Sequence, residues 1–219
     1  MKPKAARNSA IIYGASGHGK VVADILRCCG IDVEGFIDDN PALPNGDSGL
    51  KILGDGNWLF REAALRSVKV ALGIGDNFDR RLIAERIAGC KLCLLSAVHP
   101  SATIANSAKI ASGVVIMPHA VVNADASIGR GAIVNSGVIV EHDCHVGRYA
   151  HLSPGAAIGG HVTIGELAWL GIGASVIPNL RIGRGSIVGA GATVIHDIDD
   201  WVVAVGTPAR TLRKLARVV

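Results

Sequence analysis

An aliphatic residue occupies every sixth position of this chain from residue 104 to residue 194, and this repeat limits the possible folds more than any other feature. No insertion breaks the register. The residue four positions later is usually small, commonly alanine, and glycine often follows the aliphatic residue directly. The sixteen positions are Ile104, Ile110, Ile116, Val122, Ile128, Val134, Val140, Val146, Leu152, Ile158, Ile164, Leu170, Val176, Ile182, Val188 and Val194.

A six-residue unit supplies one short strand and one corner, and three units close a triangular coil with its aliphatic side chains inward. Sixteen units therefore give a little over five stacked coils. Unrelated strands would not keep a period of six over this length. The repeat predicts a parallel β-helix, in which glycines such as Gly129 and Gly147 are expected to relieve corners with positive φ.

The residues before the repeat follow another pattern. A short apolar strand at 10–13, a glycine-rich turn, a helix at about 20–29 and a strand at 33–37 predict a βαβ unit. Further elements are expected at 58–66 (helix), 68–72 (strand) and 77–88 (helix). We expect an α/β domain over residues 1–98, followed by the β-helix over 99–219.

The period fails after Asp197, and the chain continues through the segment Val205-Gly206-Thr207-Pro208-Ala209-Arg210. The basic residues that follow predict a short amphipathic helix. We expect this tail to cap the open end of the coils.

Composition excludes several classes of protein. The net charge of +4 is divided between 22 basic and 18 acidic residues without a basic patch, so a nucleic-acid partner is not expected. Neither a signal peptide nor a stretch of about 18 apolar residues is present, so no membrane association is expected. Five cysteines, an odd number, favour free thiols in the cytoplasm, and the single C-x-x-C of Cys90 and Cys93 lacks the second pair that structural zinc needs.

The first glycine-rich turn, Gly14-Ala15-Ser16-Gly17-His18-Gly19, follows a strand and opens a helix. Backbone N–H groups and the helix dipole at such a place can hold a phosphate. The spacing G-x-x-G-x-G differs from the dinucleotide fingerprint, which favours a nucleotide other than NAD. The candidate substrate-binding residues here are Gly14, Ser16, Gly17, His18 and Gly19, with Asp38 and Asp39 at the end of the next strand; the alternative is a tight turn with a solvated acidic pair.

A second turn, Gly73-Ile74-Gly75-Asp76-Asn77, ends the third strand of the same domain. Ligands of open α/β sheets bind at the carboxyl ends of the strands, so Gly75 and Asn77 are further substrate-binding candidates. A helix N-cap by Asp76 or Asn77 would explain the polar residues equally well.

These segments, with Gly35-Phe36-Ile37-Asp38-Asp39 and Val140-Glu141-His142-Asp143-Cys144, resemble one family over nearly the whole chain. The chain is similar to bacterial sugar acetyltransferases with an N-terminal nucleotide-sugar domain and a C-terminal left-handed β-helix that binds acetyl-coenzyme A. It looks most like the N-acetyltransferases of nucleotide-linked 4-amino-4,6-dideoxy sugars, such as GDP-perosamine or UDP-linked bacillosamine precursors. The resemblance implies a homotrimer and acetyl-coenzyme A as co-substrate, with no metal.

The resemblance also implies roles for single residues. His142 is the expected general base and Asp143 the residue that orients it, which suits an imidazole whose ordinary pKa is about 6.5. Adjacent residues on a strand point oppositely unless a corner intervenes, so their contact requires a corner. Asn135 is a substrate-binding candidate, and His151 is expected near the acetyl carbonyl.

Small residues along one groove are expected to admit the coenzyme. The candidates for binding acetyl-coenzyme A are His151, Gly160, Gly171, Gly173, Ala174, Gly189, Ala190, Gly191, Pro208 and Arg210. With six residues per side, His142 and His151 cannot share one face of a coil. They can meet only across a subunit boundary.

Three alternatives remain open from the sequence. One is an O-acetyltransferase acting on a sugar such as sialic acid. Another is a zinc hydratase resembling the γ-type carbonic anhydrases, with His142, His145 and His161 as ligands. The third is a scaffold without catalytic activity.

Overall fold

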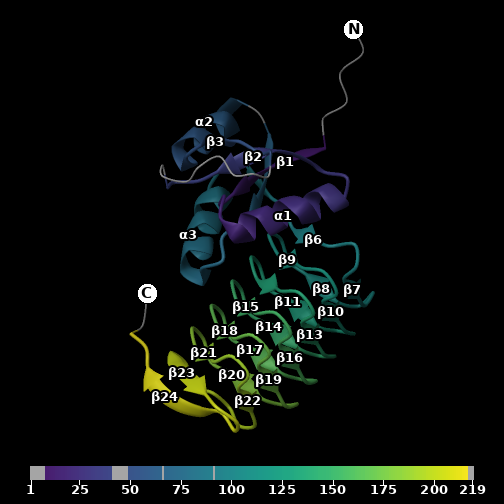
Figure 1. Cartoon of the computed structure of the whole chain (residues 1–219), viewed down its shortest axis with the longest axis vertical. Coiled ribbons are helices and arrows are strands. Elements are labelled where there is room, and N and C mark those ends of the chain that lie inside the picture. Colours follow the sequence, from purple (N-terminus) through teal and green to yellow (C-terminus); the bar gives the residue numbers. More distant parts are fainter. Residues whose placement is uncertain (1–7, 41–48, 66, 91, 217–219) are drawn as a thin grey trace. The chain divides into compact units, whose positions relative to one another are not determined.

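A computed structural model describes residues 8–40, 49–65, 67–90 and 92–216, which form two compact units divided between Pro100 and Ser101. The first contains three helices on a parallel sheet, and the second is a stack of short strands (Figure 1). Among the described residues, no helix is long and apolar enough to cross a membrane.

The first unit is a five-stranded sheet in the order β3-β2-β1-β4-β5, with every neighbouring pair parallel. Its strands are β1 (Ser9–Tyr13), β2 (Asp32–Ile37), β3 (Ile52–Gly54), β4 (Val68–Leu72) and β5 (Leu92–Leu94). Its helices are α1 (Gly17–Cys28), α2 (Gly56–Leu65) and α3 (Asn77–Ala88), and the short strand β6 (Ala97–Val98) follows. The predicted α/β domain is therefore present, and α1 begins three residues earlier than expected.

The strand order reverses at β1 and β4. The chain leaves β1 through α1 to β2 on one side, whereas β4 lies on the other side of β1. The turns that follow these two strands, at Gly14 and Gly73, consequently border a crevice at the carboxyl edge of the sheet. Such a reversal is where open α/β sheets bind ligands.

The second unit is the predicted parallel β-helix. Each of the sixteen aliphatic positions is the second residue of a two-residue strand, and those from Ile116 onward are buried. Neighbouring strands pair in parallel eighteen residues apart, as in His151 with Trp169, so one coil spans three hexapeptides. The aliphatic period and the backbone pairing therefore fix one common register.

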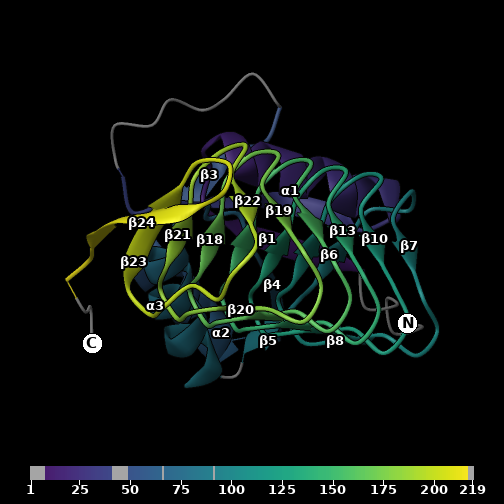
Figure 2. The same ribbon diagram turned by 90° about the horizontal axis from the view of Figure 1, so that it is seen from below.

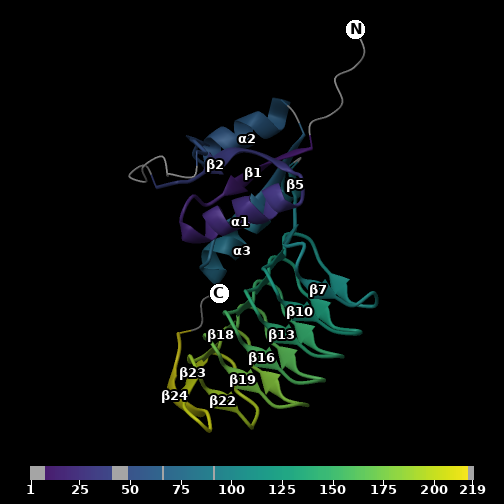
Figure 3. The same ribbon diagram turned by 45° about the vertical axis from the view of Figure 1, so that its right-hand side comes forward.

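The strands form three sheets, one for each side of the coil (Figure 2). The first sheet, which Figure 3 shows as a row, contains β7 (Thr103–Ile104), β10 (Val121–Val122), β13 (Ile139–Val140), β16 (Ala157–Ile158), β19 (Ser175–Val176) and β22 (Thr193–Val194). The second contains β8 (Lys109–Ile110), β11 (Ser127–Ile128), β14 (His145–Val146), β17 (Thr163–Ile164) and β20 (Arg181–Ile182). Within the second unit, the third contains β9 (Val115–Ile116), β12 (Ile133–Val134), β15 (His151–Leu152), β18 (Trp169–Leu170), β21 (Ile187–Val188), β23 (Val202–Val205) and β24 (Arg210–Lys214).

The glycines that follow the aliphatic residues do not have the predicted positive φ. Positive φ occurs three residues after every aliphatic position from Ile110 to Val188, at glycines such as Gly137 and at non-glycine residues such as Asp143 and His161. Gly147 is required for another reason, because a Cβ there would stand 2.5 Å from the Glu166 nitrogen of the next coil. These glycines therefore permit close stacking of the coils, and the prediction that they relieve the corners is wrong.

The predicted C-terminal helix is also wrong. Residues 210–214 form β24, which pairs antiparallel with β23, and β23 extends the sheet beyond β21. An unpaired strand edge carries free N–H and C=O groups, and pairing with the tail satisfies those of β23. The helical periodicity of the segment gave no indication that a strand edge would be available for pairing.

Candidate active site

The carboxyl edge of the N-terminal sheet carries a cavity of about 440 Å³. Of the predicted substrate-binding residues, it is lined by Gly14, Ser16, Asp38, Asp39 and Gly75. The turns after β1 and β4 approach closely, because a Cβ on Gly14 would stand 2.5 Å from the Gly73 oxygen. The cavity also includes Tyr13, Asp76 and Arg86, which the sequence analysis did not single out as ligands.

Both acidic residues at the end of β2 are engaged within the protein. Asp38 accepts hydrogen bonds from the Ala15 and Asn40 nitrogens at 2.8 and 2.9 Å. Asp39 accepts one from the Gly56 nitrogen at 2.8 Å and one from the Tyr13 hydroxyl at 2.7 Å. Burial, with the Asp39 hydrogen bond as the next cause, raises the pKa of Tyr13 well above its usual range. The two carboxylates thus hold the glycine turn and the start of α2 in place while lining the cavity.

The second turn is held by a buried cation. Arg80 is fully buried, and its guanidinium donates to the Ile74, Gly75 and Asp76 carbonyl oxygens and to Asn77 Oδ1. Asn77, predicted to bind substrate, is therefore turned to Arg80 and is not among the residues lining the cavity. Asp76 is the N-cap of α3, accepting from the Phe78 and Asp79 nitrogens.

The remaining residues of the first turn have a different place. Gly17, His18 and Gly19 begin α1 and are not among the cavity-lining residues. A Cβ on Gly19 would overlap the Gly14 oxygen, so this glycine is needed for the turn itself. His18 is largely buried, and burial followed by the nearby Arg80 charge lowers its pKa to about 4. His18 is consequently neutral at physiological pH.

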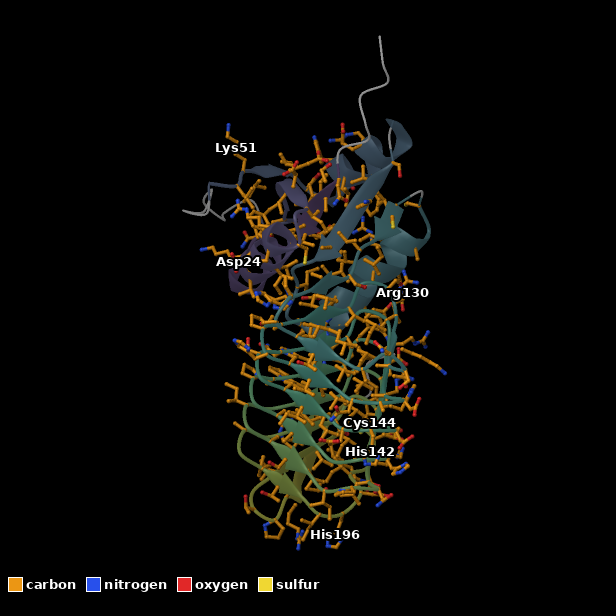
Figure 4. The ribbon with its side chains drawn as sticks, turned by 90° about the vertical axis from the view of Figure 1, so that its right-hand side faces the viewer. Asp24, Lys51, Arg130, His142, Cys144 and His196 are labelled. Atoms are coloured by element: carbon orange, nitrogen blue, oxygen red, sulfur yellow. The ribbon has the colours of Figure 1, made fainter. Side chains whose placement is uncertain are left out.

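On the β-helix, His142 and Asp143 form the expected pair. His142 Nδ1 lies 2.8 Å from Asp143 Oδ2 at the corner between β13 and β14 (Figure 4 locates His142). Asp143 has a φ of 58°, so a left-handed corner intervenes and adjacent side chains meet. The hydrogen bond from His142 is the main cause that lowers the pKa of the Asp143 carboxyl. A carboxylate held on Nδ1 leaves Nε2 available as a base.

The imidazole of His142 lies against Gly160, which is one coil further and directly in register. A Cβ on Gly160 would stand 2.6 Å from Cε1 and 2.7 Å from Nε2 of His142. Gly160 was predicted to bind the coenzyme, and the structure places it beneath the candidate base. His161, the next residue, contacts the same carboxylate, with Nε2 at 3.5 Å from Asp143 Oδ2.

Cys144, which is labelled next to His142 in Figure 4, is buried. Its thiol donates to the Gly159 oxygen at 3.1 Å, and burial raises its pKa. Since a thiolate is the reactive form of cysteine, this residue is unsuited to act as a nucleophile.

A second cavity, of about 450 Å³, lies on the third sheet of the β-helix. It brings together Asn135 and His151, whose Nδ2 and Nε2 atoms are 3.2 Å apart, and the predicted coenzyme residues Gly171, Gly189 and Ala190. The other predicted coenzyme residues, Gly160, Gly173, Ala174, Gly191, Pro208 and Arg210, are not among its lining residues. Ala174 is fully buried in the coil.

Trp169 is a residue of this cavity that the sequence analysis missed. Its ring is stacked on that of His151, with 5.7 Å between the ring centroids, and its Nε1 donates a hydrogen bond to Ser153 Oγ at 2.8 Å. Trp169 is 44% exposed and the neighbouring Ile172 is 63% exposed. A tryptophan at an outward hexapeptide position, in a chain with few aromatic residues, was the available signal.

The two parts of the candidate site lie on different sides of one coil. His151 is in β15 of the third sheet, whereas His142 is at the corner between the first and second sheets, which is opposite the third. Asn135 belongs with His151 and not with His142. His145, proposed as a third zinc ligand in the hydratase alternative, has its Nδ1 2.8 Å from Ser127 Oγ.

Comparisons with known proteins agree with this architecture. Residues 9–87 match the PglD N-terminal domain, and residues 161–196 match the bacterial transferase hexapeptide (six repeats). UDP-N-acetylbacillosamine N-acetyltransferase of Bacillus subtilis (strain 168) is 37% identical over 119 residues, which cover 51% of each chain, so the match spans about half the length of this curated relative.

Two solved structures are similar over nearly their whole length. A mutant of perosamine N-acetyltransferase from Caulobacter crescentus, in complex with CoA and GDP-perosamine, is 37% identical with a TM-score of 0.91, covering 95% of this chain and 99% of that one. The acetyltransferase domain of PglB from Neisseria gonorrhoeae FA1090, in complex with acetyl coenzyme A, is 33% identical with a TM-score of 0.87, covering 94% and 100%. These likenesses confirm the predicted fold, including the left hand of the β-helix.

The lowered pKa of His18 predicts a pH-dependent stability. The unfolded chain takes up a proton on His18 as the pH falls through about 6.5, whereas the folded chain does so only near pH 4. The free energy of unfolding of the N-terminal unit should therefore fall between these pH values, by at most about 3 kcal/mol from this residue. Denaturant titrations at several pH values should show that the free energy of unfolding of His18→Gln falls less steeply than that of the wild type as the pH is lowered. The exposed control His196→Gln should keep the wild-type slope, and an unchanged slope in His18→Gln would contradict the assignment.

The contact of Gly160 with His142 predicts the effect of a single methyl group. Gly160→Ala should push the imidazole away from Asp143, and the pKa of that carboxyl should rise toward its ordinary value, because the lost hydrogen bond is the main cause of its lowering. NMR titration of the Asp143 carboxyl carbon measures this. Gly155→Asn is the control, since Gly155 has a φ of 69° that asparagine tolerates and open space around its Cα. An Asp143 pKa unchanged by Gly160→Ala would show that the imidazole is not held there.

Proposed function

The chain belongs to the bacterial hexapeptide-repeat sugar N-acetyltransferases, and from this membership we propose that it transfers acetyl from acetyl-coenzyme A to the 4-amino group of a nucleotide-linked 4-amino-4,6-dideoxy sugar. GDP-perosamine and a UDP-linked bacillosamine precursor are the candidate acceptors. The observation that carries the proposal is the His142–Asp143 hydrogen bond at the left-handed corner of the β-helix.

The proposed reaction is a direct transfer. Asp143 holds the Nδ1 proton of His142, so that Nε2 can accept a proton from the sugar amine as the amine nitrogen attacks the thioester carbon. The C–S bond of the thioester breaks, and coenzyme A leaves as a thiol after receiving a proton from the imidazolium or from water. Cys144 takes no part, because its thiol is buried and occupied by the Gly159 carbonyl.

The N-terminal cavity is the proposed site of the nucleotide-sugar. It lies where the strand order reverses, between the Gly14 and Gly73 turns, and its position at the carboxyl edge of the sheet is that expected for a nucleotide. Asp38 and Asp39 support this cavity from within.

The cavity that includes His151 and Trp169 is the proposed acetyl-coenzyme A site. Gly171, Gly189 and Ala190 let a ligand approach the backbone, and the exposed Trp169 and Ile172 offer apolar surface to the pantetheine arm. Pro208 and Arg210 remain candidates for the adenosine end of the coenzyme.

Because His142 and His151 lie on opposite parts of one coil, the proposed enzyme is a homotrimer in which neighbouring copies complete each site. We place the reaction in the cytoplasm, which agrees with five free cysteines. The O-acetyltransferase alternative lacks comparable support, since the relatives from Bacillus subtilis and Caulobacter crescentus are both named as N-acetyltransferases.

An assay with UDP-, GDP-, dTDP- and CMP-linked sugars tests the activity. Product analysis should show an acetylated amine on a 4-amino sugar, dependent on acetyl-coenzyme A. His142→Asn should lower kcat by roughly 10²- to 10⁴-fold, the usual contribution of a general base, and should leave binding of both substrates intact. Near wild-type turnover in His142→Asn, or acetyl label retained on denatured protein, would refute direct transfer.

Mixed trimers test the shared site. If His142 of one copy works with His151 of the next, co-expressing His142→Asn with His151→Ala creates some intact interfaces from two defective chains. Random assembly should restore about a quarter of the wild-type sites in a cyclic trimer. Separately purified variants, each assayed alone, are the control, and no recovery in the mixture would indicate that each chain acts alone.

A further inference from the structure

Three side chains that commonly bind metals meet at one corner of the β-helix. His142 and Asp143 come from one coil and His161 from the next. Asp143 Oδ2 lies 2.8 Å from His142 Nδ1 and 3.5 Å from His161 Nε2. One potential ligand atom from each residue lies within 4.8 Å of the others. This arrangement differs from the set expected in the hydratase alternative, because Asp143 takes the place of His145.

The backbone holds these residues in fixed relation. Asp143 and His161 occupy the same left-handed corner position of successive coils, with φ values of 58° and 57°. The His161 nitrogen donates to the His142 oxygen at 3.0 Å. The three side chains are 54%, 42% and 57% exposed in chain order, so an ion among them would still be open to water.

The separations suit a tetrahedral ion. Zinc bonds of about 2.0–2.1 Å to nitrogen and 2.0–2.2 Å to oxygen place the ligand atoms about 3.3 Å apart. The observed distances of 2.8 and 3.5 Å bracket this value, and all three ligand atoms lie within 4.8 Å of one another, so side-chain rotations can bring them to one ion. Two histidines and one carboxylate leave a fourth position for water.

We propose that a divalent transition metal ion, with Zn²⁺ as the best fit, binds His142, Asp143 and His161 and inhibits the enzyme. The binding site rests on the geometry alone, whereas the inhibition rests on the proposed role of His142 as base. The ion is an inhibitor and not a cofactor.

The inhibition follows from the tautomers of imidazole. In the active form the single proton of neutral His142 is on Nδ1, bonded to Asp143, and the lone pair on Nε2 is free. An ion bound to Nδ1 uses the lone pair of that atom, so the proton must reside on Nε2. His142 then donates at Nε2 and cannot accept a proton from the amine. No proton is gained or lost in this exchange, yet the base disappears.

The binding site is tested with Co²⁺, which reports tetrahedral coordination by its visible absorption. The full chain is stripped with chelator and titrated with CoCl₂. We expect visible bands in the wild type without the near-ultraviolet charge-transfer band of a thiolate ligand, which would point to the exposed cysteines instead. His161→Asn should weaken binding at least about tenfold, since even an outer-shell partner of a metal ligand contributes about 10- to 100-fold to metal affinity. The matched control is His145→Asn, an exposed histidine three residues from His142, which should bind as the wild type does.

Inhibition is measured in the acetyl-transfer assay as the ratio of turnover with and without ZnCl₂, so that each variant is its own reference. ZnCl₂ should lower the turnover of the wild type and of His145→Asn at least about tenfold, because a general base contributes roughly 10²- to 10⁴-fold to the rate. EDTA should restore the turnover of both. The turnover of His161→Asn should change less than about twofold when ZnCl₂ is added.

Each failure has a separate meaning. Absence of Co²⁺ bands in the wild type, or equal bands in His161→Asn, overturns the metal site while leaving the acetyltransferase intact. Binding without inhibition overturns the inhibitory role. If the proposed function is wrong, the metal-free assay will show no acetyl transfer. The Co²⁺ titration does not depend on that activity and still tests the metal site.

Discussion

The parallel pairing of strands eighteen residues apart is the constraint on which the rest of the β-helix depends. Aliphatic residues at every sixth position fill the coil, and backbone hydrogen bonds between coils then allow one register only. Residues eighteen apart are therefore stacked. This pairing places Gly160 against His142, His161 beside Asp143, and Trp169 on His151. A glycine at one position and an imidazole eighteen residues earlier form a single structural unit, because any side chain on the glycine would displace the ring.

The left-handed corners convert this regular stack into a site. A residue with positive φ breaks the strict alternation of side chains along a strand, so neighbours in sequence can meet. Asp143 occupies such a corner and thereby contacts His142. The left-handed conformation costs energy in most residues other than glycine. Glycines such as Gly137 and Gly155 adopt it without strain at their corners, whereas Asp143 and His161 adopt it despite having a Cβ.

The N-terminal unit is organised by buried polar contacts instead of a repeat. Asp38 and Asp39 hold the first glycine turn and the start of α2, and the buried Arg80 holds the second turn through three carbonyl oxygens and Asn77. Carboxylates at the end of β2 thus shape the cavity through their bonds to the protein as well as by lining it. Burial beside Arg80 also keeps His18 neutral, so the positive charge near this turn belongs to arginine.

The sequence by itself determined the β-helix and the α/β domain before it, because a six-residue period and a strand–turn–helix pattern are local signals that no tertiary contact reverses. Its resemblance to a known family, and not its periodicity, indicated His142 and Asp143 as a candidate pair. The sequence did not determine which residues meet across coils. Trp169 joins His151, Gly160 lies beneath His142 and His161 replaces His145 near Asp143 only because stacking adds an eighteen-residue spacing to the six-residue one. The prediction of a helix in the C-terminal segment was wrong for a related reason. The segment forms β24 because it pairs with the free edge of β23, and that edge arises only when the coils are assembled. Local patterns decided the elements, and the long-range backbone pairing decided the neighbours of each functional side chain.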